Sequence, residues 1–175
     1  FASDSPAALN RALNAAARTK PDALVISALQ GDVVKAMIGA RKRAALKKVP
    51  FIGGNAFNAP GLYEQTKGAA EGAISGTAWV AGRKTPGSAA FEASYRARYG
   101  AAPDQFAAQA YAGVKLLYTA LTRSGGASGP ALRDALAGLR KVPSVLGTFS
   151  FDAAREPQYP AAVVQIRKGR PVTIG

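Results

Sequence analysis

The 175-residue sequence contains no cysteine and no histidine. This absence excludes thiol nucleophiles, Ser-His-Asp and Cys-His catalytic groups, histidine general bases and zinc sites built from these two residues. The ten acidic residues fall mostly in turns, helix caps and solvated helix faces, and their spacing does not support a pair of catalytic carboxylates. We therefore expect a protein that is not an enzyme and that holds no catalytic residue, metal or cofactor.

Long apolar segments are also lacking, since no run of about eighteen apolar residues occurs. No signal-like segment opens the sequence, which we interpret as a mature or truncated polypeptide. Hydrophobic residues nevertheless make up 48% of the chain, enough for the core of one ordinary domain or two small ones.

Acidic residues are scarce relative to basic ones, which gives a formal net charge of +13 and a pI near 10.4. Such values are typical of nucleic-acid-binding proteins. The cations are spread over the whole chain, however, and no basic block is interleaved with aromatic residues. The densest group, Arg41–Arg43 with Lys47 and Lys48, ends a predicted helix, where the helix dipole favours cations. We favour a solvated basic surface and keep nucleic-acid binding as an alternative.

The segment Pro21–Asn58 has the pattern of a strand, a helix and a second strand. Residues 23–27 form a short apolar run with β-branched members, apolar residues then recur at helical spacing from Val33, and Pro50 starts another apolar run. Parallel strands joined in this way bind ligands at their carboxyl ends. A ligand site is therefore expected at residues 28–32 and 53–58.

These two turns carry small residues and uncharged polar groups, namely Ser27, Gln30, Asn55 and Asn58. Amides and hydroxyls suit hydrogen bonding to a small solute better than acid–base chemistry. The alternative is a pair of ordinary turns in which Asp32 and Asn58 act as helix N-caps.

The sequence opens on a helix with Ser5 as its N-cap and Pro6 at its first position. No strand precedes this helix, so the chain looks cut. After the central segment, a short helix over 60–66, a strand ending at Trp79 and a linker over 81–87 are expected.

From Ser88 three helices follow one another without an intervening strand. The second, predicted over 103–124, carries one apolar stripe made of Phe106, Ala110, Val114, Leu117 and Leu121. The helices either pack on one another or cover a sheet supplied from elsewhere. Strands return over 147–151, 161–167 and 171–174.

Several segments in this order resemble the C-terminal half of a type I periplasmic substrate-binding protein, closest to the branched-chain amino-acid-binding set of ABC importers. They are PDALVIS, VPFIGGNAF, GAAEGAISGTAW, FEASYRARYGAAPDQFAAQAYAGVKLL and VLGTFSFDAAREPQYPAAVVQIRKG. The resemblance implies an α/β fold with two Rossmann-like lobes, parallel sheets and flanking helices, of which this chain lacks the N-terminal half. It assigns 1–80 to the second lobe, 81–145 to a helical part of the first lobe, and 146–175 to return strands of the second.

The resemblance further implies a periplasmic protein that captures a small amino acid or an organic or aromatic carboxylate between its lobes by hinge closure. The implied partners are this solute, an ABC permease in the inner membrane and the missing half of the same protein, with no nucleic acid. Two lobe crossovers are expected at 77–85 and 139–147. A ligand-sensing module of a receptor or regulator is the alternative with the same fold.

The resemblance also suggests ligand-binding residues. Leu29 and Gln30 occupy the turn in which the family often has an aromatic contact, and Asn55 stands where amino-acid binders carry a carboxylate for the α-ammonium group. Phe106, with Phe57 as a second candidate, would cover the ligand's apolar body. Asn55 should therefore make ordinary α-amino acids poor ligands.

Overall fold

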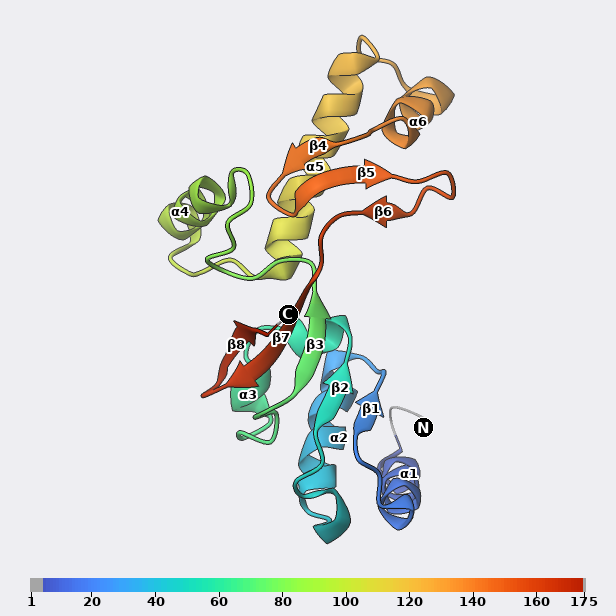
Figure 1. Ribbon diagram of the computed structural model, residues 1–175, viewed down its shortest axis with the longest axis vertical. Coiled ribbons are helices and arrows are strands. Elements are labelled where there is room, and N and C mark those ends of the chain that lie inside the picture. Colours follow the sequence, from blue (N-terminus) through green and yellow to red (C-terminus); the bar gives the residue numbers. More distant parts are fainter. Residues whose placement is uncertain (1–4, 175) are drawn as a thin grey trace. The chain divides into compact units, whose positions relative to one another are not determined.

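The computed structural model describes residues 5–174, which form two compact units (Figure 1). Unit 1 contains the chain up to Thr77 together with the chain from Ala162 onward, and unit 2 contains the residues between them. The chain therefore passes from one unit to the other twice, at Thr77–Ala78 and at Ala161–Ala162. Among the described residues, no helix combines the length and apolarity that a membrane crossing needs.

Unit 1 is built on a five-stranded sheet in the order β1-β2-β3-β7-β8. Strands β1, β2 and β3 are parallel, whereas β7 pairs antiparallel with β3 and β8 antiparallel with β7. Their bounds are Leu24–Ile26, Phe51–Gly53, Ile74–Thr77, Ala162–Arg167 and Arg170–Thr173. The predicted strand–helix–strand segment and the α/β class are confirmed.

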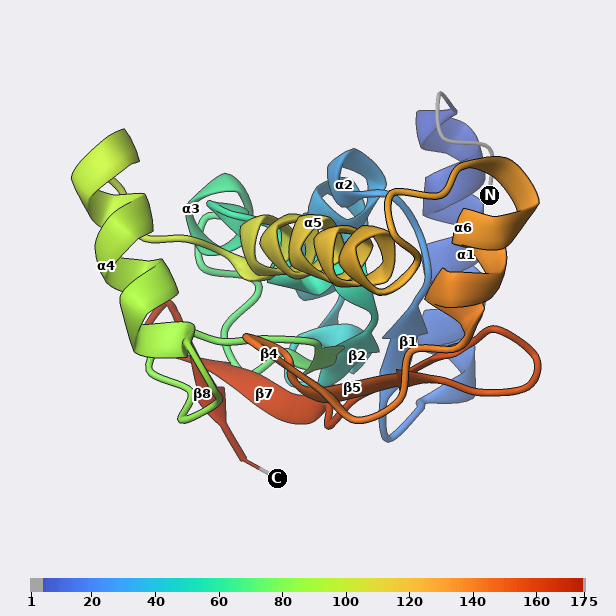
Figure 2. The ribbon, with the colours of Figure 1, turned by 90° about the horizontal axis from the view of Figure 1, so that it is seen from above.

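The helices of unit 1 lie on one side of this sheet (Figure 2). Ser5 caps the first as predicted, since its Oγ accepts a hydrogen bond from the Ala8 N–H at 3.2 Å. Buried side chains of the second helix, among them Val33 and Met37, meet Phe51 from the sheet in one core. The elements are α1 (Pro6–Thr19), α2 (Gln30–Arg41), η1 (Ala44–Leu46), η2 (Asn55–Asn58) and α3 (Leu62–Gln65).

The opposite face of the sheet is largely exposed. The strand register aligns Val25, Ile52, Ile74, Gln165 and Val172 in one row across all five strands. Val25 is 71% exposed, and Ile52 and Val172 are about two-fifths exposed. Sheets of this α/β kind usually have both faces covered, so unit 1 by itself leaves an apolar surface in contact with water.

Arg41 fastens the end of α2 to the segment before β2. Its guanidinium donates to the carbonyl oxygens of Val49 at 2.7 Å and of Leu46 and Ala69 at 3.2 Å, and it lies 3.9 Å from the centre of the Phe51 ring. Burial lowers the pKa of Arg41 from its usual value, because desolvation disfavours the charged form.

Unit 2 consists of three helices and a three-stranded antiparallel sheet of order β4-β5-β6. The sequence predicts that these helices pack on one another or cover a sheet supplied from elsewhere; in the structure α6 packs against α5, and α5 also lies beside β4 of the same unit (Figure 2). Buried Leu116 and Ala120 of α5 pack with Val142 and Phe149 of the strands. The elements are α4 (Ser88–Tyr99), α5 (Gln105–Arg123), α6 (Gly129–Ala137), β4 (Val142–Ser144), β5 (Gly147–Phe151) and β6 (Pro157–Gln158).

The predicted assignment of 146–175 as one set of strands returning to the second lobe is wrong. This sheet divides that range, because β5 and β6 belong to unit 2 whereas β7 and β8 belong to unit 1. Val142 pairs with Phe149 and Ser144 with Gly147, so 139–147 lies wholly within unit 2 and is not a passage between units. The side-chain hydroxyl of Ser144 donates to the Gly147 carbonyl at 2.8 Å and closes the turn between β4 and β5. The second passage instead follows β6, at Ala161–Ala162.

The buried stripe of α5 also differs from the predicted one. The residues that pack inward are Gln105, Ala108, Ala112, Leu116 and Ala120. In the predicted stripe, Phe106 is 42%, Val114 67% and Leu117 40% exposed. Helical periodicity marks both stripes equally well, and the one with small alanines faces inward because it allows the helix to approach its neighbours closely.

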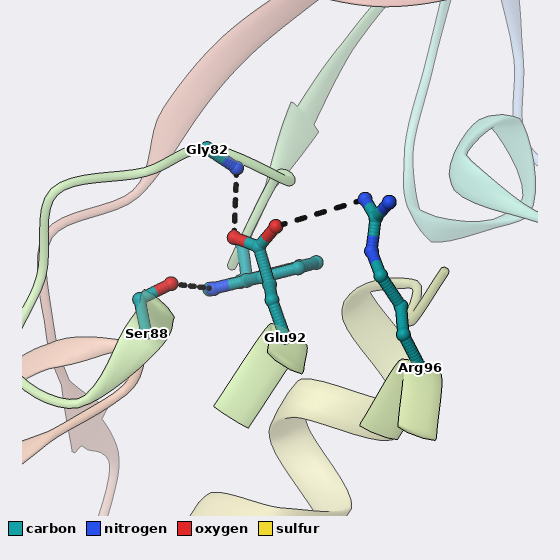
Figure 3. Close-up of polar contacts among 5 residues, drawn as sticks. Gly82, Ser88, Glu92 and Arg96 are labelled. Atoms are coloured by element: carbon teal, nitrogen blue, oxygen red, sulfur yellow. Dashed lines mark hydrogen bonds and ion pairs between the residues drawn. The ribbon is translucent and has the colours of Figure 1, made fainter. Parts of the chain in front are cut away.

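The segment between β3 and α4 is held to α4 by polar contacts (Figure 3). A carboxylate oxygen of Glu92 accepts from the Gly82 N–H at 2.8 Å, and its other oxygen lies 4.0 Å from the Arg96 guanidinium. The indole N–H of Trp79 donates to the Ser88 hydroxyl at 2.9 Å. This connection is therefore an ordered part of unit 2.

Candidate functional site

The candidate site lies at the carboxyl edge of the parallel strands in unit 1. The turn after β1 leads into α2, and the turn after the neighbouring β2 forms η2. Because β1 and β2 are adjacent and parallel, these two turns lie at the same edge of the sheet. The two turns that the sequence predicts to face a ligand are therefore neighbours on one edge of the sheet.

Leu29 and Gln30 form the start of α2. Leu29 is 82% exposed, and its carbonyl accepts from the Asp32 and Val33 N–H groups. The Gln30 side-chain amide donates to Gln65 Oε1 at 3.2 Å and the Pro60 carbonyl at 3.4 Å. Leu29 thus presents an apolar side chain at this edge, and Gln30 links α2 to the segment around α3.

Asp32 is not the N-cap that the alternative interpretation assigned to it. Leu29 holds the cap position with extended backbone angles and contributes no side-chain hydrogen bond. Asp32 lies within the first turn, where it forms an ion pair with Lys35 at 3.3 Å. The carboxylate still benefits from the positive end of the helix dipole, without occupying the cap.

Asn55 and Phe57 differ sharply in their surroundings. Asn55 is exposed and begins η2, whereas Phe57 is 4% exposed and belongs to the core of unit 1. The Phe57 ring fills the space beside Gly53, where an added Cβ would overlap it. Asn55 therefore lies at the surface of η2, whereas Phe57 anchors the same turn in the core.

Asn58 uses its whole side-chain amide to tie the turn to β3. Its Nδ2 donates to the Gly76 carbonyl at 2.8 Å, and its Oδ1 accepts from the Ser75 hydroxyl at 2.9 Å. It is therefore not the predicted N-cap. No spacing signal in the sequence marks this contact, because pairing of β2 with β3 brings Asn58 and Ser75 together.

Phe106 lies in unit 2, in the first turn of α5. Asp104 caps this helix, since its Oδ1 accepts from the Ala107 N–H at 2.8 Å. The structure thus brings Leu29, Gln30 and Asn55 to one edge of unit 1, buries Phe57 beneath that edge, and places Phe106 in the other unit.

The edge presents mainly neutral groups. Within residues 5–174, no three side chains of the Cys, Asp or Glu type come together in a way that could hold a metal ion. The Asp32 carboxylate at the start of α2 is paired with Lys35, while Gln30 and Asn55 are amides. Such a surface can donate and accept hydrogen bonds, but it supplies no arranged acid–base pair.

Comparison with known proteins shows that residues 3–171 match a family model described as periplasmic binding protein. Among solved structures, a leucine-binding protein LivK from Thermotoga maritima has 21% identity and a TM-score of 0.90, with 100% of this chain and 49% of that chain covered. This agreement confirms the predicted type I periplasmic-binding-protein fold.

Two further solved structures contain bound solutes. LivJ from Streptococcus pneumoniae in complex with isoleucine is 26% identical, with a TM-score of 0.77 and coverage of 98% of this chain and 49% of that chain. A solute-binding protein of an ABC transporter from R. palustris in complex with benzoate is also 26% identical, with a TM-score of 0.77 and coverage of 94% and 45%. The chain therefore spans about half the length of the structures it matches.

Proposed function

The chain belongs to the periplasmic binding protein family, and we propose that it is part of the extracytoplasmic solute-binding component of an ABC importer. In this role the protein captures a small amino acid or an organic carboxylate between two lobes and delivers it to a permease in the inner membrane. The protein performs no catalysis. Two relatives support the solute class, since one is a complex with isoleucine and the other with benzoate.

The observation that carries this proposal is the neutral edge formed by exposed Leu29 and Asn55 and half-buried Gln30, in a unit from which the described part of the chain passes to its neighbour twice. Ligands of α/β sheets bind at this edge. A hinge requires few connections, each able to absorb a change in backbone angles, and the passages Thr77–Ala78 and Ala161–Ala162 meet the first condition.

The rest of the binding protein would cover the apolar surfaces that this chain leaves exposed. One is the sheet face of unit 1 that carries Val25, Ile52 and Val172, and the other is the α5 stripe that carries Phe106 and Val114. The matched structures are about twice as long as this chain, which leaves a comparable length of protein for this purpose. We assign unit 1 to the second lobe and unit 2 to the first.

Because Asn55 is an amide, we propose a ligand whose carboxylate or carbonyl group lies next to η2. A buried ammonium ion needs charged or several neutral acceptors, and an amide supplies one neutral oxygen. The same amide can donate to a carboxylate oxygen. Leu29, and Phe106 from the other unit, would then contact the apolar body of the solute.

Calorimetry on the full-length protein tests this assignment with leucine, a short dicarboxylate and benzoate as ligands. We expect a carboxylate to bind more tightly than leucine, and Asn55→Asp to reverse the order. Asn14→Ala serves as a control, because that amide lies on α1 and accepts from Arg43 instead. Submicromolar leucine binding that survives Asn55→Ala would refute the role of Asn55, and failure to bind any small solute would refute the capture function.

A further inference from the structure

The edge of the unit 1 sheet opposite the candidate site is strongly basic. Cations precede each parallel strand, and the antiparallel pairing of β7 brings the turn between β7 and β8 to the same edge. We call these residues the basic edge: Arg18, Lys20, Lys42, Arg43, Lys47, Lys48, Lys67, Arg167, Lys168 and Arg170. All are exposed except Arg43, which is half-buried. No ion pair formed within residues 5–174 involves any of them.

Few acids oppose these charges. Asp22 and Glu71 are the acidic residues in the segments that lead into the parallel strands at this edge. Both carboxylate oxygens of Glu71 accept from backbone, from the Lys168 N–H at 2.7 Å and the Gly169 N–H at 3.2 Å. The basic edge therefore concentrates positive charge on one side of unit 1, whereas the candidate site on the other side is nearly neutral.

The helix dipole accounts for cations at helix ends, including Lys20 at the C-cap of α1 and Lys67 just after the C-cap of α3, but not for Lys168 in the turn between β7 and β8. Lys20, Lys67 and Lys168 have φ values of 48°, 53° and 51°, in the left-handed region. Glycine adopts this region without strain, whereas a residue with a Cβ does so at a conformational cost. All five described non-glycine residues with positive φ are lysine or arginine. Lys141 and Arg155 share this backbone conformation but lie in unit 2, so what distinguishes the basic edge is the gathering of exposed cations that form no ion pair within residues 5–174.

We propose that the basic edge is a docking surface for the anionic headgroups of a phospholipid membrane. Lysines near such a surface gain electrostatic attraction, and their flexible stems can follow headgroups that move laterally. The one aromatic ring found among these cations, that of half-buried Tyr63, packs against Gly68 and Gly169, whereas surfaces that bind single-stranded nucleic acid usually provide several rings for base stacking. The proposal rests on the importer function, since it concerns a protein that works at a membrane, and it leaves the candidate site directed away from the lipid.

Vesicle cosedimentation of the full-length protein tests this docking surface. The vesicles contain equal parts phosphatidylglycerol and phosphatidylcholine, or phosphatidylcholine alone. We expect binding only to the anionic vesicles, weakening as salt is raised. K20G/K67G should bind about twenty-five-fold more weakly, from two cations each contributing about fivefold.

A matched control exists in unit 2, where Lys141 and Arg155 have φ values of 51° and 66°. K141G/R155G removes the same charge and relieves the same backbone strain, so we expect its vesicle binding to stay within about twofold of the parent. Both double variants should keep or raise the melting temperature, which separates lost docking from lost folding.

Equal weakening in the two double variants would overturn the proposal in favour of a general net-charge effect. Absence of binding to anionic vesicles at low salt would also overturn it, as would tighter binding to duplex or single-stranded DNA than to vesicles in the same buffer. Solute calorimetry on the same samples separates the two proposals, because the importer function fails if no solute binds, whereas docking fails only if the vesicle result does.

Discussion

Gly53→Ala tests the packing that supports the candidate site. Gly53 ends β2 and does not have a positive φ, so alanine can adopt its backbone conformation. The difficulty is space, because an added Cβ would overlap the ring of Phe57, which is buried beneath η2. The methyl group must therefore displace the ring, and with it the turn that carries Asn55.

Overpacking of this kind costs about 1–3 kcal/mol, and the lower entropy of alanine in the unfolded chain offsets about 0.4–1 kcal/mol. We expect Gly53→Ala to lower the free energy of unfolding by about 1–2 kcal/mol. Phe57→Leu alone should cost about 1–2 kcal/mol through lost packing. In the double variant the smaller leucine leaves room for the methyl group, so the combined loss should be smaller than the sum by about 1 kcal/mol.

Urea unfolding of the four proteins of this double-mutant cycle measures the coupling. Gly31→Ala is the control, since an added Cβ meets no atom within 4 Å there and alanine favours the α2 helix. Strictly additive losses in the cycle would refute the steric explanation. A destabilised Gly31→Ala would show that loss of glycine, rather than the clash, is responsible.

Two other changes probe single contacts in each unit. Arg41→Lys should lower the free energy of unfolding by about 2–3 kcal/mol, because a lysine cannot donate to three carbonyls and cover the Phe51 ring at once. Lys42→Met, at the exposed neighbouring position, is the control, and an Arg41→Lys loss no greater than the Lys42→Met loss would contradict this prediction. Ser88→Ala removes the buried hydrogen bond to Trp79 and should cost about 1–2 kcal/mol. Trp79 is the sole tryptophan, so its emission reports the change directly, and an unaltered spectrum and stability would contradict it.

Local signals in the sequence predicted much of unit 1. Ser5 followed by Pro6 marked the start of α1, and the change from apolar runs to helical spacing marked β1, α2 and β2. These features depend on neighbouring residues, so a local pattern is sufficient to find them. The exposure of Leu29 and Asn55 also agrees with their predicted place at a strand end.

The errors concern choices that only tertiary contacts decide. Two stripes of α5 satisfy the same period; the one with Ala108 and Ala112 is buried within this chain, and the one with Phe106 is left for the alternative in which protein from elsewhere covers it. Pairing of Val142 with Phe149 keeps β4 and β5 together in unit 2, although the apolar pattern of β5 resembles that of the strands in unit 1. Phe57 and Asn58 likewise received their structural roles from partners that lie elsewhere in the sequence.

The two chain passages leave unit 1 from one strand pair. Thr77 and Ala162 are direct partners at the end of the antiparallel ladder between β3 and β7, which holds their Cα atoms about 5 Å apart. The strands therefore act mechanically as a single ribbon. Sliding one strand along the other would break several ladder hydrogen bonds, whereas bending or twisting both together breaks none. A force applied to one passage is therefore transmitted to the other, and the ribbon deforms most easily by bending and twisting.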